Sequence, residues 1–168
     1  MKHQLSWGSL LVLACAAIYF ITRTTDQLPA MVASHFDAGG YPTAFIPRAR
    51  YLHFVLALGV GVPLALVALL TAVYSRAADM KLPNRDYWLA PERIAQTRDL
   101  LVGHGIWFGS LLISMVCFFH WLELKANRSL PAHLPNDLVY AGLIIFFLIT
   151  VGWIAALLLA FRLPRSAP

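Results

Sequence analysis

Charged residues are scarce in this chain of 168 residues: they make up 12% of it, and only eight are acidic. A soluble domain ordinarily carries about a quarter of its residues as Asp, Glu, Lys or Arg. Hydrophobic residues, in contrast, account for 60% of the chain. This composition excludes an ordinary soluble domain and a charge-rich disordered segment, and it predicts an integral membrane protein.

Cysteines and catalytic motifs are also few or missing. The only two cysteines, Cys15 and Cys117, lie inside apolar runs, which disfavours a disulfide framework. We find no H-E-x-x-H zinc helix, no phosphate-binding glycine loop, and no paired nucleophile and base or two-carboxylate site. The basic residues form no long run of the kind that binds nucleic acid. We therefore expect a protein that is not an enzyme, needs no cofactor and binds no nucleic acid.

Four apolar runs dominate what remains: 5–22, 52–74, 100–122 and 138–161. Each is close to the roughly 20 residues that a helix needs to cross a bilayer, and none contains a charged residue. Pro91 and Glu92 are favourable at a helix N-terminus, so the third helix is expected to span 91–122. The sequence predicts an all-α fold, a single domain over 1–168 with four transmembrane helices in a bundle.

Lysines and arginines divide unevenly between the two sides of such a bundle. The side that holds both termini carries eight of them, and the other side carries five. The larger group comprises Lys2, Arg76, Lys81, Arg85, Arg93, Arg98, Arg162 and Arg165. Because loops in the cytoplasm are enriched in Lys and Arg, this count predicts that both termini lie in the cytoplasm and that the first connection lies outside the cell.

The first connection, RTTDQLPAMVASHFDAGGYPTAFIPRAR, is the most polar and least repetitive part of the chain. Leu28, Met31, Val32, His35 and Phe36 follow helical spacing, and Gly39 or Gly40 can end a helix. We therefore expect a short amphipathic helix here, lying on the membrane or on the bundle. The candidate ligand-binding residues of this loop are His35, Phe36, Asp37, Gly39, Gly40 and Pro42.

Two blocks of the sequence resemble a known family. LPAMVASHFDAGGYP, with LPNRDYWLAPER further on, resembles the bacterial membrane family called domain of unknown function 1648, over about residues 5–95. The same module occurs at the N-terminus of sporulation-delaying-protein immunity proteins, which are longer membrane proteins that protect a producing cell from its own toxin and take part in signalling. The resemblance implies recognition of a peptide toxin or envelope signal at the outer loop.

The second block lies between the second and third helices, on the side expected to be cytoplasmic. Tyr87 and Trp88 suit either an interfacial aromatic belt or a docking surface for a cytoplasmic or membrane protein partner. Glu92 and Arg93 would form a charge network with Arg85 and Asp86 that locks the loop, or they would belong to the docking surface. The candidate partner-binding residues are Tyr87, Trp88, Glu92 and Arg93.

Histidines supply the remaining candidates. His104 lies inside the third apolar run, between two glycines, and is a candidate polar site within the membrane. His120 and Glu123 share a helix face, and with His35 they would form a metal or pH-sensing site if the first loop folded over the bundle. A simpler interpretation competes with both candidate sites: these histidines would be ordinary polar side chains that serve packing or lie at the membrane interface.

The sequence as a whole favours a non-catalytic membrane recognition protein, similar to immunity or signalling proteins, which binds a peptide or envelope ligand outside the cell. Two alternatives remain open. One is a small oligomeric transporter or an ion or proton conductor, with a homo-oligomer enclosing a path beside His104. The other is an accessory subunit of a larger membrane complex.

Overall fold

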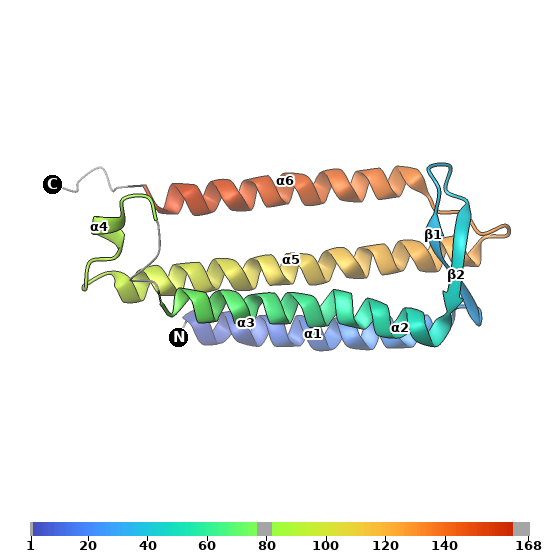
Figure 1. Ribbon diagram of the computed structural model, residues 1–168, viewed down its shortest axis with the longest axis horizontal. Helices are drawn as coiled ribbons and strands as arrows, with labels where there is room; N and C mark the ends of the chain where they lie inside the picture. The colour runs from blue at the N-terminus through green and yellow to red at the C-terminus, as the bar shows by residue number, and fades with distance from the viewer. Residues whose placement is uncertain (1, 77–81, 163–168) are drawn as a thin grey trace.

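The computed structural model describes residues 2–76 and 82–162, with side chains from Trp7 onward. Four long helical segments run side by side (Figure 1). The elements are α1 (Lys2–Thr25), β1 (Met31–Phe36), β2 (Pro42–Pro47), α2 (Arg48–Leu56), η1 (Ala57–Gly61), α3 (Val62–Tyr74), α4 (Arg85–Trp88), α5 (Ile94–Arg128) and α6 (Asn136–Ala160). By length and composition, the segments Trp7–Thr25, Arg48–Tyr74, Ile94–Arg128 and Asn136–Ala160 are able to cross a membrane. The prediction of four such helices is confirmed.

The second long segment consists of α2, η1 and α3, where η1 is a single π-helical stretch. Pro63 is the second residue after it. A proline has no N–H to donate, and its ring presses on the carbonyl four residues earlier, here Gly59. A wider π turn is a common way for a helix to accommodate such a disturbance without breaking. The segment therefore continues as one apolar rod past the proline.

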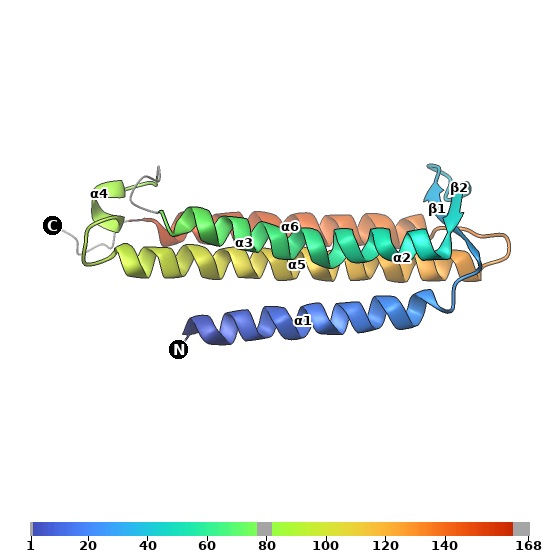
Figure 2. The ribbon, with the colours of Figure 1, turned by 60° about the horizontal axis from the view of Figure 1, so that its bottom comes forward.

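The expected amphipathic helix in the first connection is wrong: β1 and β2 form a two-stranded antiparallel hairpin there. The hairpin stands at one end of the bundle, and the short helix α4 stands at the other (Figures 1 and 2). Helical spacing predicted that Met31 and Val32 would both face inward, yet Val32 is fully buried and Met31 is 51% exposed. Neighbouring side chains of a strand point to opposite faces, which accounts for this difference between Met31 and Val32. SHFDAGG is thus the end of a strand and a hairpin turn.

Helix ends also differ from expectation, most of all in the third helix. α5 begins at Ile94 rather than Pro91 and continues to Arg128 rather than Leu122. Its 35 residues measure about 52 Å at 1.5 Å per residue, against about 30 Å of hydrocarbon. The surplus length therefore lies partly at the hairpin end, where α5 supports the hairpin, and not only at the α4 end.

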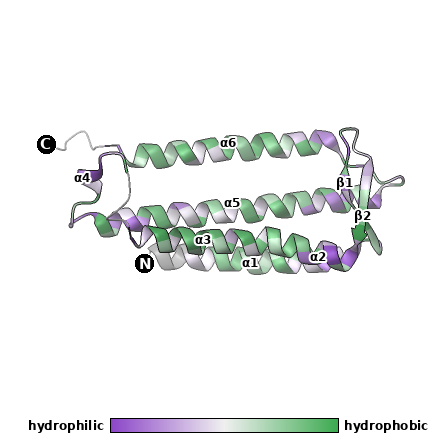
Figure 3. Ribbon diagram, viewed as in Figure 1, coloured by the Kyte–Doolittle hydropathy of each residue, from purple (hydrophilic) through white to green (hydrophobic). Residues whose placement is uncertain are grey.

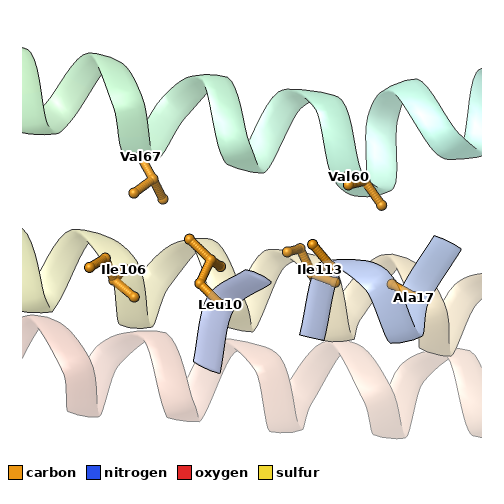
Figure 4. Close-up of a cluster of buried hydrophobic side chains, with 7 residues drawn as sticks. Leu10, Ala17, Val60, Val67, Ile106 and Ile113 are labelled. Atoms are coloured by element: carbon orange, nitrogen blue, oxygen red, sulfur yellow. The ribbon is translucent and has the colours of Figure 1, made fainter. Parts of the chain in front are cut away.

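Helix α5 is the centre of the bundle, with α1 on one side and the α2–α3 rod beside it. A buried apolar cluster in the middle of the bundle joins these three elements (Figure 4). A second cluster, which includes Ile21, Val32 and Tyr51, continues the core to the underside of the hairpin. The hairpin is therefore packed on the bundle and does not project freely.

Helix α6 differs from the others because none of its residues is buried. It lies along α5 (Figure 1), and its residues are mostly hydrophobic (Figure 3). Trp153 stacks on Phe108 of α5 with ring centroids 4.8 Å apart. Apolar side chains that would be unfavourable in water are stable in contact with lipid, so this helix is suited to the lipid-facing edge of the protein.

Candidate functional site

The end of α5 fixes the hairpin through one asparagine. Asn127 Oδ1 accepts a hydrogen bond from the Ala33 N–H at 2.8 Å, and its Nδ2 donates to the Ala33 carbonyl at 3.0 Å. On the other side, Arg48 at the start of α2 donates to the carbonyls of Asp26 and Leu28, both at 2.9 Å. These paired contacts tie the position of β1 to the helices below it.

The hairpin turn uses the residues that the sequence singled out. Asp37 Oδ1 accepts hydrogen bonds from the N–H groups of Gly39 and Tyr41, both at 2.9 Å. Gly40 has a φ of +84°, a conformation that glycine adopts without strain. A Cβ at Gly40 would also lie 2.6 Å from the Leu134 carbonyl oxygen. Asp37, Gly39 and Gly40 therefore build the turn.

The turn is also held by the connection between α5 and α6. The Leu134 N–H donates to the Gly40 carbonyl at 2.8 Å, and Asn136 Nδ2 donates to the Ala38 carbonyl at 2.9 Å. His133 Nε2 lies 3.1 Å from the Gly39 carbonyl, and its ring packs edge-on against Tyr41. With its tip clamped in this way, the hairpin is a fixed cover at this end of the bundle.

A cavity of about 240 Å³ lies beneath this cover. It opens between the hairpin, the first turns of α2 and the last turns of α5. Its lining combines charged, hydroxyl, imidazole and apolar side chains: Ser34, His35, Ile46, Arg50, Tyr51, Phe54 and Glu123. A small cavity that brings a few polar groups together within apolar walls is the usual form of a ligand site.

A bulge in the hairpin explains how two consecutive residues reach the same cavity. Ala33 pairs with Phe45 and His35 pairs with Ala44, so Ser34 is left without a partner in the register. Successive side chains of a regular strand point to opposite faces, whereas an extra residue re-aims them. Ser34 and His35 both line the cavity as a result, and Ser34 Oγ lies 3.0 Å from His35 Nδ1.

A chain of hydrogen bonds crosses the bundle directly behind this cavity. His120 is 2% exposed and links three helices: its Nε2 lies 2.7 Å from Thr24 Oγ1 on α1, and its Nδ1 lies 2.7 Å from the Tyr51 hydroxyl on α2. The Tyr51 ring stacks on the imidazole, and the Phe20 ring meets it edge-on. Both ring nitrogens are thus occupied within the protein.

The proposed metal set does not assemble. Among the residues that the structure describes, no group of three or more His, Cys, Asp or Glu side chains is placed to hold a metal ion. His35 and Glu123 line the same cavity, but His120 points into the bundle and gives its nitrogens to Thr24 and Tyr51. His120 therefore supports the cavity wall and is not available as a ligand.

At the opposite end of the bundle, the predicted residue Trp88 contacts the end of α6. Trp88 Nε1 and Asn84 Nδ2 both donate to the Phe161 carbonyl, at 3.0 and 2.9 Å. The rings of Trp88 and Phe161 meet edge-on, and the Thr97 hydroxyl donates to the Trp88 carbonyl at 2.7 Å. Trp88 thus holds the last turn of α6 against the start of α5.

The other candidates of this loop face outward or pack locally. The guanidinium of Arg93 lies 3.9 Å from the centre of the Tyr87 ring, which is a close cation–π contact. Glu92 is exposed. The four candidates therefore do not form one surface: Trp88 is directed to α6, while Tyr87 and Arg93 pair with each other.

His104 lies in a groove between α5 and α6. Its Nδ1 is 3.1 Å from the Leu100 carbonyl one turn earlier, and its own carbonyl accepts a hydrogen bond from Trp153 Nε1 at 3.2 Å. A groove of about 580 Å³ is lined here by Trp107, Ile149 and neighbouring residues of both helices. Among the residues that the structure describes, no second charged or titratable side chain lines this groove.

Sequence reasoning missed most of the cavity lining. Ile46, Arg50, Tyr51 and Phe54 were treated as part of a loop and a membrane helix, although Ser34 and His35 lay in the segment that was singled out. Tyr51 and Phe54 are three residues apart at the start of a helix, which is a signal for neighbouring side chains. The partner that completes the cavity, Glu123, lies far away in sequence and is brought there only by the fold.

Comparisons of the chain with protein-family models, with curated proteins and with solved structures gave no match.

Proposed function

We propose that this chain is a multi-pass protein of the bacterial cytoplasmic membrane that recognises a peptide or envelope ligand at its hairpin end. Both termini would lie inside the cell and the hairpin outside. Recognition would be non-covalent, and its role would be similar to immunity or signalling. The observation that carries this proposal is the cavity of about 240 Å³ beneath the clamped hairpin, with its mixed polar and apolar lining.

Three features support recognition at this end. The hairpin is fixed at both its strand and its turn, so a ligand would meet a cavity that is already formed. A preformed site loses less conformational entropy on binding than a mobile loop does. The cavity also brings together residues from three separate parts of the chain, with His35 on the hairpin, Phe54 on α2 and Glu123 on α5.

The groove beside His104 gives only weak support to the competing class, a transporter or conductor. Its lining is almost entirely apolar, and the Trp153 side chain that closes one side is engaged with the α5 backbone. A path for ions needs polar groups along its length, and this groove offers one imidazole. Packing of α6 against lipid or another membrane helix accounts for the groove without transport.

Survival of a deletion strain tests the immunity form of the proposal. The strain is challenged with concentrated culture medium of its parent, after receiving either the unchanged chain, the double variant His35→Ala/Phe54→Ala, or His104→Ala. We expect the unchanged chain and His104→Ala to restore survival and the double variant to fail, because only it alters the cavity. Membrane levels of each chain, measured by immunoblot, control for expression.

Protection by the double variant at the level of the unchanged chain would contradict a role for the cavity. Loss of protection with His104→Ala alone would instead favour the groove between α5 and α6. Equal survival of the deletion strain and its parent would remove the support for self-protection.

A further inference from the structure

We propose that a phospholipid binds between α5 and α6 at the hairpin end of the bundle, with one acyl chain in a groove between the two helices and the phosphate beside Trp121 and Lys125. This site lies outside the cavity beneath the hairpin and does not depend on the ligand proposed there. Three observations carry the inference: the apolar lining and length of the groove, the exposure of α6, and two polar groups without a partner where the groove ends.

The groove is lined by hydrocarbon. It has a volume of about 320 Å³ and lies between Met115 and Phe118 of α5 and the first half of α6, from Leu138 to Ile149. Every lining residue is apolar except Ser114, whose hydroxyl donates to a backbone carbonyl one turn earlier at 2.9 Å. The groove therefore suits an acyl chain, which needs no hydrogen-bond partner.

The groove is also about as long as one leaflet is deep. Leu138 and Ile149 are eleven residues apart on α6, which corresponds to about 16 Å at 1.5 Å per residue. One leaflet contributes about half of a hydrocarbon core that is about 30 Å thick. A single acyl chain that runs from the hairpin end to the middle of the bilayer thus has the length of this groove.

Helix α6 leaves the groove open to the bilayer. None of its residues is buried, and Ala141, Ile145 and Ile149 are exposed although they line the groove. Figure 3 shows that α6 is hydrophobic over most of its length. Lipid tails are as apolar as leucine, so they contact such a surface without cost. An acyl chain therefore fills the space that the protein leaves between the two helices.

Two polar side chains stand where the groove ends. The Trp121 ring adjoins the Phe118 ring, with centroids 5.9 Å apart, and the Lys125 ammonium lies 4.9 Å from the centre of the Trp121 ring. Both Trp121 and Lys125 are exposed. Among the residues whose side chains the structure describes, neither the indole N–H nor the ammonium has a hydrogen-bond or ion-pair partner. Both are available to a ligand.

A lipid phosphate fits these two groups. The indole N–H and the ammonium only donate hydrogen bonds, and a phosphate accepts them and carries the charge opposite to that of Lys125. Tryptophan and the ends of lysine side chains are typical of the membrane–water interface, where phosphates lie. Lys125 follows Phe118 by seven residues, which is two helical turns or about 10 Å. A phosphate beside Lys125 therefore directs its acyl chain past Phe118 into the groove.

Native mass spectrometry of the purified full chain in detergent micelles tests this inference. The probes are dioleoylphosphatidylglycerol and dioleoylglycerol, which has the same two acyl chains and no phosphate. We expect one molecule of the phospholipid to remain bound to each chain. Dioleoylglycerol should bind about fivefold more weakly or less, because it offers Lys125 no opposite charge.

The substitutions Lys125→Ala and Arg23→Ala form a matched pair for the phosphate. Arg23 is also an exposed cation close to an aromatic ring, 5.7 Å from the centre of the Tyr19 ring, but it lies on α1 and does not adjoin the groove. We expect Lys125→Ala to weaken binding of the phospholipid about fivefold and Arg23→Ala to leave it unchanged. Lys125→Arg retains the charge and should preserve binding.

A second pair tests the groove. Ala141→Trp places a large ring in the groove, whereas Ile144→Trp adds the same ring to an exposed position of α6 outside the lining. We expect Ala141→Trp to weaken binding of the phospholipid by about tenfold or more, since it removes the apolar contacts of one acyl chain, and Ile144→Trp to have little effect. The unfolding midpoint of each variant shows that it is folded.

Three results would overturn the proposal. Equal binding of the two lipids, or equal effects of Lys125→Ala and Arg23→Ala, would contradict recognition of the phosphate. Binding that Ala141→Trp leaves unchanged, or no retained phospholipid at all, would contradict an acyl chain in the groove. A dimer of the chain that Ala141→Trp dissociates and that excludes the phospholipid would assign the groove to a second copy instead.

Discussion

Replacing His120 with alanine is expected to lower the free energy of unfolding by about 3 kcal/mol, the largest loss among the substitutions considered for this protein. The imidazole joins α1, α2 and α5 through Thr24 and Tyr51 and is 2% exposed. Hydrogen bonds between membrane helices contribute about 0.6–1.7 kcal/mol each, and removal of a buried ring adds the cost of a cavity. The Tyr51 hydroxyl also loses its acceptor.

Reversible unfolding in mixed detergent and lipid micelles measures this change, with His53→Ala as the matched control. His53 is an exposed histidine at the same end of the bundle. A surface substitution away from any special contact changes stability by about 0.5 kcal/mol or less. Similar losses for His53→Ala and His120→Ala would show that the hydrogen-bonded chain through His120 does not hold the helices together.

The second large effect is expected at Gly109, where α5 packs closely against Val67 of α3. A Cβ added there would lie 2.4 Å from Val67 Cγ2, and Val67 is itself 1% exposed. The two helices must separate or the valine must shift, and overpacking of this kind costs about 1–3 kcal/mol. Gly109→Ala should therefore lower the unfolding midpoint in the same micelles.

Two further variants isolate the cause. A Cβ at Gly103, on the same helix, meets nothing within 4 Å, so Gly103→Ala should leave the midpoint nearly unchanged. The double variant Gly109→Ala/Val67→Ala removes the crowding methyl groups and should recover part of the loss. Non-additivity of this kind is expected for residues in direct contact. Equal effects of the two glycine substitutions, with no recovery in the double variant, would contradict close packing at this point.

The long helices were predictable because they rest on a simple physical requirement. A backbone in lipid must satisfy its own hydrogen bonds, so a run of about 20 apolar residues is a helix whatever its neighbours are. Their ends were less predictable. Pro91 and Glu92 are typical of a helix start, yet α5 begins at Ile94. At the other end it continues to Arg128, where Asn127 is used to hold β1.

The hairpin shows why the first connection was predicted wrongly. Short apolar segments fit helical and strand spacing equally well when they are taken alone. The turn itself carried a usable signal, since two short runs separated by five residues with glycines are typical of a hairpin. Contacts between residues far apart in sequence stabilise the hairpin. Asn127 pairs with both backbone groups of Ala33, and the connection before α6 binds the turn. A local pattern contains none of these contacts.

The candidate site was predictable only in part. His35 and Glu123 were both singled out from the sequence and both line the cavity. Asp37, Gly39 and Gly40 were proposed as ligand-binding residues, whereas in the structure their polar groups build the turn. His120 was proposed to join an outer cluster, but its nitrogens turn inward to Thr24 and Tyr51. Spacing shows which residues share a helix face, and it does not show which neighbour uses each polar atom.

Protection of the cavity in intact cells tests the central claim most directly, namely that the hairpin end faces outward and holds a ligand. Ser34→Cys and Thr43→Cys are placed separately in a chain whose Cys15 and Cys117 are replaced by alanine. Ser34 lines the cavity, and Thr43 is an exposed residue of β2 outside it.

A maleimide that does not cross membranes is applied with and without concentrated culture medium of the parent strain. We predict labelling at both positions, with the medium slowing only the reaction at position 34. Labelling that requires broken cells, or an equal rate at position 34 with and without the medium, would contradict the account.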